Sequence, residues 1–470
     1  MRVSHRAVVC RALSAVVLLF AAAVPSFPAE SAGAEERLPR KLVIALDAVP
    51  YWVVEDVMNS DLGEEALFKD FKGPVPMVST FPSSTSVALV GMLGPFGLGL
   101  SPGYEARFYD WEMGKVRGGG VVSYHRIEFP WREYFDWGRK GPAGSAIEGL
   151  GPIKFSIKRL RNAIQDFATN NRETFFIYIA PTDTAAHTKG PEALKEVFVA
   201  LDDMLTELQA TQERPIEVVI FSDHGLAGDE PLENVWEGLK KTLKQAGLKR
   251  RPKRLKGPKD VVLIPFGLVS SVEAYVLEEN KSAVAGVLAS APGIDLCVYE
   301  SDDEWLVESR RGRAAFRVEE TSSGLVWFYE PISGDPFDYL PLIEEFGAPT
   351  ASESPALPDA DWFRVSFDAT YPDAFYRLMR SFELVENPAS ILCSVEPGYM
   401  YGSRKTERLA ILGGGRLRWT HGALFRQATW GFLMSNAASW EPPAAVRFDQ
   451  SLLPFLDVER GSENFAAGGE

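Results

Sequence analysis

Residues 216–225, Ile-Glu-Val-Val-Ile-Phe-Ser-Asp-His-Gly, contain a run of β-branched and aromatic side chains that ends in a carboxylate and an imidazole. Such an apolar run predicts an interior strand of a parallel sheet, because both faces of that kind of sheet are covered. Asp223 and His224 would leave the sheet at the carboxyl end of the strand, where open α/β sheets bind ligands. Taken alone, an Asp-His pair here is more often a turn residue and a hydrogen-bonded histidine than a metal site. The rest of the chain must therefore decide its role.

A second strand is predicted at residues 174–180, followed by a loop that carries Asp183 and His187. After this loop, apolar residues at helical spacing predict a helix over 191–208. Strand, loop and helix lead into the strand at 216–221, which makes a βαβ unit and a largely parallel sheet. Asp183 and His187 are thus expected at the same edge of the sheet as the Asp-His pair.

Two stretches nearer the N-terminus add polar groups of the same kind. Residues 41–47, Lys-Leu-Val-Ile-Ala-Leu-Asp, predict a first strand that ends in Asp47, although a carboxylate in this place usually caps a turn. Hydroxyl side chains at 83–85 precede an apolar segment at 86–93 that is predicted to be helical. A hydroxyl cluster ahead of a helix is most often an N-cap, but the same geometry directs free backbone N–H groups at an anion.

These residues, with a histidine near the C-terminus, occur in an order that resembles the alkaline phosphatase superfamily, specifically its phosphodiesterase/nucleotide pyrophosphatase branch. The resemblance is carried by five fragments, V-I-A-L-D at 43–47, F-P-S-S-T at 81–85, D-T-A-A-H-T-K-G-P at 183–191, F-S-D-H-G at 221–225 and T-H-G at 420–422. Each fragment is short, but together they span most of the chain in the family's order. The resemblance implies an α/β fold with a mostly parallel central sheet flanked by helices.

The same resemblance implies a centre with two divalent metal ions. One ion would be held by Asp47, Thr85, Asp223 and His224, and the other by Asp183, His187 and His421. Zinc is the expected ion, since mixed Asp/His sites with an open position suit it. Thr85 would be the nucleophile that forms a phosphothreonine intermediate, and Ser83 or Ser84 would take its place if the alignment is shifted.

The chain departs from the family pattern in one way that bears on the substrate. The branch usually has an Asn about twenty residues beyond its nucleophile to bind a phosphoryl oxygen, whereas residues 103–110 contain none. Arg107 is a candidate for a similar task. The Cys/Ser-x-Pro-x-Arg signature of sulfatases is also absent from the sequence. The expected activity is therefore hydrolysis of phosphate diesters or monoesters, with a small molecule or a headgroup as substrate.

Two other functions stay open at this point. One is a metal-binding protein of the same fold that has lost catalysis and binds a phosphorylated ligand or a cell-envelope partner. The other is a phosphotransferase that passes the phosphoryl group to an alcohol. Nucleic acid is not an expected partner, because the 470-residue chain has a formal net charge of -15.

The N-terminus has the pattern of a secretory signal peptide. Three arginines precede the apolar run at 12–24, which is shorter than the ~20 residues of a membrane span, and Ala-Gly-Ala at 32–34 is a small-residue cleavage signal. We therefore expect a periplasmic or secreted protein with no transmembrane span after cleavage, and an N-terminal membrane anchor is the alternative. In that oxidising setting Cys297 and Cys393 could pair. Two independent buried thiols is the interpretation slightly favoured by the sequence.

The remaining sequence divides the chain into parts. Short strands follow one another after Asp260, at 261–266, 295–299, 305–308, 314–318 and 325–329, and a loop rich in proline and acidic residues is expected at 347–362. The predicted parts are a signal peptide at 1–34, a first core part at 35–260, a β-rich insertion at 261–405 and a C-terminal core part with His421 at 406–470.

Overall fold

The computed structural model describes residues 38–59, 66–119, 127–138, 151–347, 355–404, 407–408 and 417–457. Apart from Leu38, these residues lie in one unit, Pro39–Glu470. The signal peptide expected at 1–34 lies outside the described residues. Among the described helices, none has the length and apolar character that a membrane span requires.

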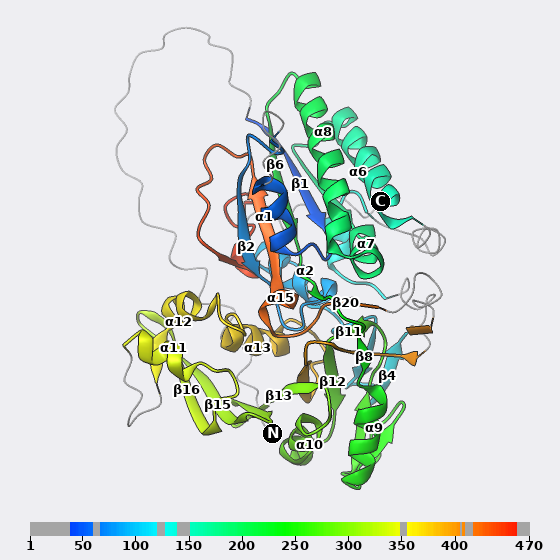
Figure 1. Ribbon diagram of the computed structural model, residues 1–470, viewed down its shortest axis with the longest axis vertical. Coiled ribbons are helices and arrows are strands. Elements are labelled where there is room, and N and C mark those ends of the chain that lie inside the picture. The colour runs from blue at the N-terminus through cyan, green and yellow to red at the C-terminus, as the bar shows by residue number, and fades with distance from the viewer. Residues whose placement is uncertain are drawn as a thin grey trace. The chain divides into compact units, whose positions relative to one another are not determined.

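A six-stranded sheet carries the strands predicted around the Asp and His residues (Figure 1). Its order is β22 (Val446–Arg447), β2 (Lys72–Val78), β21 (Trp430–Ser435), β6 (Ile216–Ser222), β1 (Arg40–Leu46) and β5 (Thr174–Ile179). β1 pairs in parallel with both β5 and β6, and β22 pairs in parallel with β2. Only β21 runs antiparallel to its neighbours in this sheet. The prediction of an α/β fold with a mostly parallel sheet is confirmed.

Both faces of this sheet are covered, and alternate residues of β1 enter different cores. Leu42 and Ile44 share an apolar core with α1 (Tyr51–Asn59), α6 (Pro152–Thr169) and α8 (Lys195–Thr211). Val43 and Ala45 share another core with α2 (Thr85–Leu93). Figure 1 shows α6 and α8 side by side along the sheet. This two-sided burial explains why β1 is apolar at five consecutive residues, 42–46, and β6 at four, 218–221, rather than at every second residue.

Asp183 and His187 lie on a helix, so the prediction of a loop at this place is wrong. The helix is α7 (Pro181–Lys189), which begins directly after β5. Pro181 suits the first turn, because a backbone N–H there would find no acceptor within the helix and proline has none to place. Asp183, in the same turn, is favoured by the helix dipole. The mostly polar composition of this helix hides it from a reading based on apolar periodicity. The four-residue spacing now places both side chains on one face of the helix.

The β-rich segment forms a nine-stranded sheet. Its order is β17 (Ala356–Pro358), β16 (Gly324–Gly334), β15 (Gly312–Thr321), β14 (Glu304–Ser309), β13 (Ile294–Ser301), β18 (Ile391–Val395), β12 (Ser271–Tyr275), β10 (Asp260–Leu263) and β9 (Lys249–Arg251). Apart from the parallel pair of β9 and β10, neighbouring strands are antiparallel. α9 (Trp236–Gln245) and α10 (Lys281–Ala289) share an apolar core with its middle strands. All five short strands predicted for this segment are present.

Further short elements lie outside these two sheets. They include the hairpin of β3 (Arg107–Asp110) and β4 (Lys115–Gly118), the strands β7 (Ala227–Gly228), β8 (Glu233–Asn234), β11 (Leu268–Val269), β19 (Tyr399–Gly402) and β20 (Trp419–Thr420), and the helices α4 (Trp131–Tyr134), α11 (Leu340–Glu345), α12 (Asp359–Ser366), α13 (Ala374–Glu383) and α15 (Arg426–Thr429). β17 and the start of α12 replace the end of the loop expected at 347–362, and residues 348–354 lie outside the described residues. The two acidic residues of α12 occupy the first turn, where they favour a helix, although they read as loop residues in the sequence.

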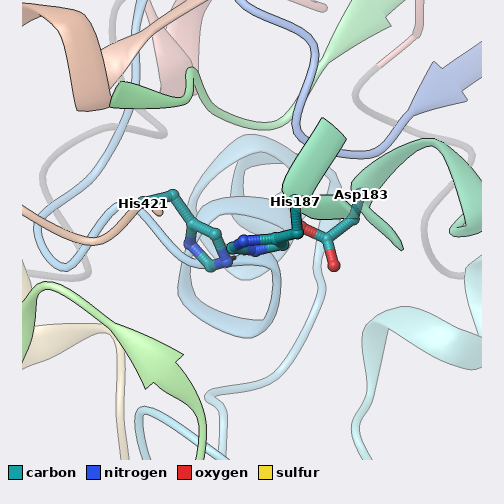
Figure 2. A group of neighbouring side chains, drawn as sticks. All are labelled: Asp183, His187 and His421. Atoms are coloured by element: carbon teal, nitrogen blue, oxygen red, sulfur yellow. Dashed lines mark ion pairs between the residues drawn. The ribbon is translucent and has the colours of Figure 1, made fainter. Parts of the chain in front are cut away.

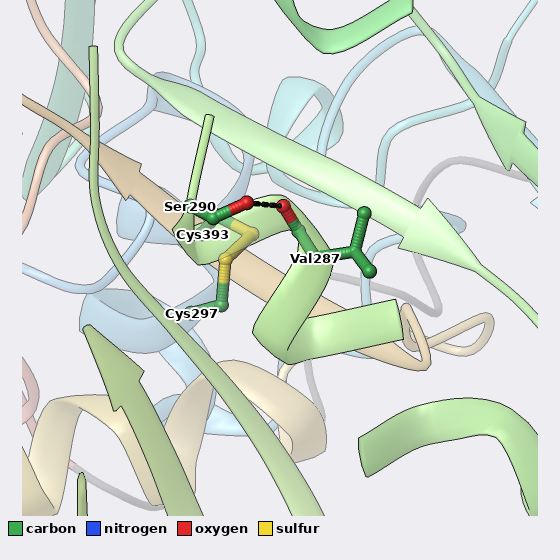
Figure 3. The surroundings of a disulfide bond; sticks show 4 residues. All are labelled: Val287, Ser290, Cys297 and Cys393. Atoms are coloured by element: carbon green, nitrogen blue, oxygen red, sulfur yellow. Dashed lines mark hydrogen bonds between the residues drawn. A yellow bond between two sulfur atoms is a disulfide. The ribbon is translucent and has the colours of Figure 1, made fainter. Parts of the chain in front are cut away.

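A disulfide joins Cys297 to Cys393, which corrects the sequence-based preference for two independent thiols (Figure 3). The two cysteines are direct partners in the pairing of β13 with β18, and both are fully buried. Figure 3 shows the bond beside Val287 of α10 and Ser290, the residue that follows this helix. Their positions are 96 residues apart in sequence, so only the pairing of the strands brings the sulfur atoms together.

Candidate active site

Seven polar residues from five segments meet at the carboxyl edge of the parallel strands. Asp47 follows β1, and the adjacent Asp223 and His224 follow β6. Thr85 is the first residue of α2, α7 carries two more, and His421 follows β20. The residues that the sequence singled out are thus brought together by the structure, with Thr85 rather than Ser83 or Ser84 nearest to the carboxylates. Ser83 is instead fully buried, and its hydroxyl donates to the carbonyl of Thr80 at 2.9 Å.

The first group consists of Asp47, Asp223 and His224, whose ligand atoms lie within 4.8 Å of one another. His224 Nε2 lies 3.7 Å from Asp47 Oδ1 and 3.5 Å from Asp223 Oδ2. The other oxygen of Asp223 is held by the backbone N–H of Ala48 at 3.1 Å and that of His224 at 3.0 Å. Asp223 Oδ2 and His224 Nε2 are buried and have no hydrogen-bond partner among the described residues. Two unpaired acceptors that face each other leave a position suited to a cation.

The second group consists of Asp183, His187 and His421, and its ligand atoms also lie within 4.8 Å of one another. Figure 2 shows the Asp183 carboxylate directed at both imidazoles. Asp183 Oδ1 is 3.1 Å from His187 Nε2 and 3.7 Å from His421 Nε2. The rings of His421 and His224 are stacked with their centroids 4.2 Å apart, so the two groups are adjacent.

Backbone carbonyls fix the tautomer of all three histidines. Each Nδ1 lies against a carbonyl oxygen: His187 against Trp419 at 2.7 Å, His224 against Gly225 at 2.9 Å and His421 against Ser83 at 2.8 Å. Because a carbonyl only accepts, each Nδ1 must carry the hydrogen, and each Nε2 of a neutral ring presents a lone pair to a carboxylate. That arrangement is repulsive unless a proton or a metal ion lies between, and it is the usual orientation of metal-binding histidines.

Thr85 lies between the first group and the start of α2. Its hydroxyl donates to Asp47 Oδ1 at 3.1 Å, and the side chain is partly exposed. The backbone N–H groups of Val87 and Ala88 donate to the carbonyl of Ser84 at 3.1 and 2.9 Å. The N–H groups ahead of them, at Thr85 and Ser86, are the ones that the start of a helix leaves unpaired, and they lie at the positive end of its dipole. A phosphoryl group placed over Thr85 would therefore meet both a hydroxyl and backbone donors.

The charges of the site shift several pKa values strongly. Burial and the negative charges of Asp223 and Asp183 raise the pKa of Asp47 well above its usual range. Burial also raises the pKa of Asp223 to about 6. Burial opposes ionisation of Asp183 as well, but nearby histidines outweigh it and lower the pKa of this group. The site thus holds more carboxylate groups than its histidines can neutralise, which favours the binding of a positively charged ion.

The pKa values of the three histidines shift in different directions. Burial lowers the pKa of His224 to about 4, and burial together with His224 lowers the pKa of His421 to about 3. Burial also acts to lower the pKa of His187, but the carboxylate of Asp183 outweighs it and raises this pKa. His224 and His421 are therefore neutral at pH 7, which is the form that binds a metal ion.

Two residues that support the site escaped the sequence analysis. The Tyr178 hydroxyl of β5 donates to Asp47 Oδ2. Arg377 of α13 is fully buried and donates to the carbonyls of Ser79 at 2.8 Å and Leu424 at 2.8 Å. It thereby ties the segment before Thr85 to the segment after His421. The only signal for Arg377 in the sequence is a cation beside the apolar residues of an amphipathic helix.

Arg107, the sequence-based candidate for a phosphoryl contact, is partly buried in β3. Its Cδ atom lies 2.7 Å from the position that a Cβ atom at Gly119 would take. In the same stretch, the negative charge of Asp183 in the second group is one of the causes that raise the pKa of Glu105. A contact of Arg107 with substrate remains a prediction.

Comparison with known proteins gives likeness in structure alone. No family model and no curated protein sequence matches the chain. Among solved structures, phosphonoacetate hydrolase from Sinorhizobium meliloti in complex with phosphonoformate is 12% identical, with a TM-score of 0.46 over 88% of this chain and 94% of that one. The mouse and human ectonucleotide pyrophosphatase/phosphodiesterase 5 are 11% and 10% identical, with TM-scores of 0.41 and 0.42, each over 87% of this chain and 92% of theirs.

Because these TM-scores lie below 0.5, we base the function on the geometry of the site and not on this likeness. What the chain shares with these solved structures, over most of its length, is a likeness in structure alone.

Proposed function

We propose that this protein is an exported two-metal phosphohydrolase of the alkaline phosphatase superfamily that cleaves phosphate esters through a phosphothreonine intermediate. One observation carries the proposal. Two groups of three ligand residues each, with their ligand atoms within 4.8 Å, lie side by side next to the hydroxyl of a threonine that begins a helix.

The residues fit two divalent ions of the zinc type. Asp47, Asp223 and His224, with Thr85, would hold one ion, and the second group would hold the other. Their mixed oxygen and nitrogen donors, the buried unpaired ligand atoms and the fixed tautomers are what such an ion needs. When bound, the ions would supply charge stabilisation for the phosphoryl oxygens and would favour ionisation of the threonine hydroxyl and of water.

The chain's own residues would divide the remaining work. Thr85 Oγ1 attacks phosphorus, the bond from phosphorus to the leaving oxygen breaks, and the alcohol leaves with a proton. The Thr85 hydroxyl proton already points to Asp47, which directs the oxygen lone pairs away from that carboxylate. The first N–H groups of α2 would bind a phosphoryl oxygen. Water then attacks the phosphothreonine, which restores the hydroxyl and releases phosphate.

Export is part of the same proposal. The disulfide supports an oxidising compartment such as the periplasm or the cell exterior, because buried structural disulfides are rare in the cytosol. The leader at 1–34, the division of the core into 35–260 and 406–470, and the insertion at 261–405 belong to this proposal as well. The insertion would form part of the wall that selects the leaving group.

The test is hydrolysis of 4-nitrophenyl phosphate and bis(4-nitrophenyl) phosphate by the metal-depleted protein, before and after addition of Zn²⁺. Thr85→Ala should remove turnover of both esters and leave two bound metal ions in elemental analysis, because Asp47, Asp223 and His224 still supply three ligands to the first ion. Thr211→Ala, an exposed residue at the end of α8, is the matched control and should keep turnover. His224→Ala and His187→Ala should each lower the metal content by about one ion, because each removes a ligand of a different group.

The outcomes separate the candidate functions. Turnover that depends on metal and on Thr85 supports the hydrolase, and the preferred ester gives the substrate class. Two bound ions with no turnover of either ester would point to a metal-binding protein that has lost catalysis. Turnover retained by Thr85→Ala would contradict the phosphothreonine intermediate.

A further inference from the structure

A strongly basic segment runs from residue 249 to residue 259, although the whole chain has a formal net charge of -15. It consists of the strand β9 and the turn that leads from β9 into β10, and it contains no acidic residue. Six of its cationic side chains are exposed, namely Lys249, Arg250, Lys253, Arg254, Lys256 and Lys259. The proposed chemistry uses none of them.

Backbone contacts hold this basic segment in place. Its two ends meet, because the N–H of Lys249 donates to the carbonyl of Lys259 at 2.7 Å. The carbonyl of Lys253, in the middle of the turn, accepts from the N–H of Val116 in β4 at 2.8 Å. Leu255 packs against the apolar core that contains Val43 and Ala45. The six cations therefore stand on a closed, anchored loop rather than on a free tail.

The cations of the basic segment lack acidic partners. The nearest carboxylate along the chain, Asp260, is 3% exposed and is occupied by Arg251 Nε at 2.9 Å and by the N–H of Lys256 at 2.8 Å. Within the part of the chain that the structure describes, none of the six exposed cations forms an ion pair. Ordinary solvated surfaces mix charges of both signs, whereas this one repels itself until an anion binds.

The positive surface continues from the basic segment onto α9. The ring of Trp236, the first residue of α9, has Lys240 Nζ 5.5 Å from its centroid and Arg250 Cζ 5.2 Å from it. Two cations, one from α9 and one from β9, thus lie against the same ring. Lys241 and Lys244 of α9 are exposed as well. The helix and the basic segment therefore present their charges together.

Two exposed apolar side chains adjoin this surface. They belong to the turn at 111–114 between β3 and β4, and β4 is the strand that donates to the basic segment. Trp111 is 40% exposed and Met113 is 47% exposed. The indole N–H of Trp111 donates to the carbonyl of Pro388 at 2.8 Å, so this ring is held outward in one position. The turn also carries one exposed acid, Glu112, against the six cations.

We propose that the basic segment 249–259 and the turn 111–114 dock the protein on a membrane surface that contains acidic phospholipids. The unpaired cations complement the phosphate groups of such lipids. The two apolar side chains favour a bilayer over a dissolved polyanion, because the headgroup region takes up tryptophan and other apolar groups beside lysine and arginine. Docking requires no reaction at Thr85, so it stands or fails independently of the proposed hydrolysis.

The experiment measures partitioning onto sedimented vesicles of phosphatidylcholine, with and without an equal part of phosphatidylglycerol. The wild-type protein should bind the acidic vesicles far better than the neutral ones. The triple variant Lys253→Gln, Arg254→Gln and Lys256→Gln should lower this partition coefficient on the order of 100-fold, at about fivefold for each cation removed. Raising NaCl from about 0.1 M to about 1 M should release the wild-type protein, because the Debye length falls from about 10 Å to about 3 Å.

The matched control is a triple variant with the same loss of charge on another surface. Lys154, Lys158 and Arg161 are exposed cations of α6, and their replacement by Gln should change partitioning little. Lys253→Arg with Lys256→Arg keeps the charge of the basic segment and should keep binding. A mere change in net charge or in folding would not follow this pattern.

The apolar part of the surface has its own test. Met113→Ser should weaken binding on the order of 5- to 10-fold, the equivalent of one to two buried CH₂ groups, and leave the salt dependence unchanged. Ile332→Ser, in β16, removes a side chain of similar exposure, 48%, and should have no effect.

Three outcomes would overturn the proposal. The first is equal binding to acidic and neutral vesicles, and the second is an equal loss of binding in both triple variants. The third is binding of a DNA oligonucleotide or of polyphosphate by protein that does not bind acidic vesicles, which would make the partner a soluble polyanion. The N-terminal apolar run is common to every variant, so it cannot produce a difference between them.

Discussion

At the scale of single residues, the carboxyl of Asp47 faces three different groups. It accepts hydrogen bonds from Thr85 at 3.1 Å and from Tyr178, and it lies 3.7 Å from His224 Nε2. Hydrogen bonds from the two hydroxyls partly offset the effect of burial and of neighbouring carboxylates on its pKa. Tyr178 therefore acts on the ligand rather than on substrate, and it holds the Asp47 carboxylate in one orientation.

Glu273 gives a pH-dependent prediction for stability. Its pKa rises from 4.5 to about 7 on folding, so the folded state binds the proton more tightly than the unfolded state. The stability that this group contributes is fully present below about pH 4.5 and is lost as the pH rises through 7. Glu273→Gln, which resembles the protonated form, should raise the free energy of unfolding at pH 8.5 by up to about 3 kcal/mol and change it little at pH 4.5.

Urea unfolding of the metal-depleted protein at the two pH values measures this effect. The exposed Glu320→Gln is the control and should show no such difference. An equal effect of Glu273→Gln at both pH values would show that the Glu273 carboxyl is not forced to ionise in a buried place.

At the scale of elements, α2 has to be placed accurately because Thr85 is its first residue. The helix packs closely against the C-terminal segment at one glycine. A Cβ atom at Gly91 would lie 2.6 Å from the ring of Phe448 and 3.1 Å from Thr80 Cγ2. The contact between Gly91 and the ring of Phe448 thus limits how closely α2 approaches the C-terminal segment.

Gly91→Ala should therefore destabilise the protein by about 1–3 kcal/mol, because the added methyl group overpacks this contact. Gly286→Ala is the matched change in another helix, α10, where nothing lies within 4 Å of the new Cβ. That variant should gain about 0.5–1 kcal/mol, since alanine favours a helix. Thermal unfolding of both variants distinguishes the two effects. A neutral Gly91→Ala would mean that Phe448 can move away from α2 without cost.

At the scale of the whole molecule, the chain leaves the α/β core after β6, forms the nine-stranded sheet and returns with His421 and β21. His421 then stacks on His224, although almost two hundred residues separate them in sequence. The site is complete only when this long excursion has folded. The disulfide lies within the excursion and joins its middle strands.

The disulfide should stabilise the whole chain mainly by restricting the unfolded state. For a closed loop of about 100 residues the chain-entropy model gives about 4.7 kcal/mol, and measured values are typically about 2–4 kcal/mol. We expect the double variant Cys297→Ala and Cys393→Ala to lower the free energy of unfolding by an amount in this range. Chemical unfolding of protein made in an oxidising compartment measures it. Two free thiols in that protein after denaturation under alkylating conditions would contradict the bond.

The sequence by itself determined the strands β1, β5 and β6, the start of α2 and the order of the seven site residues. These features are local, because apolar periodicity and short spacings are properties of neighbouring residues. The same local reading missed α7, whose composition is mostly polar, although the spacing of its Asp and His was visible.

Only the tertiary structure decided which distant groups meet. It placed Tyr178 on Asp47, Arg377 between two segments of the site, and the two cysteines on paired strands. The physical reason is that pairing of strands and packing of side chains depend on how the whole chain folds back on itself, and spacing along one stretch cannot encode that.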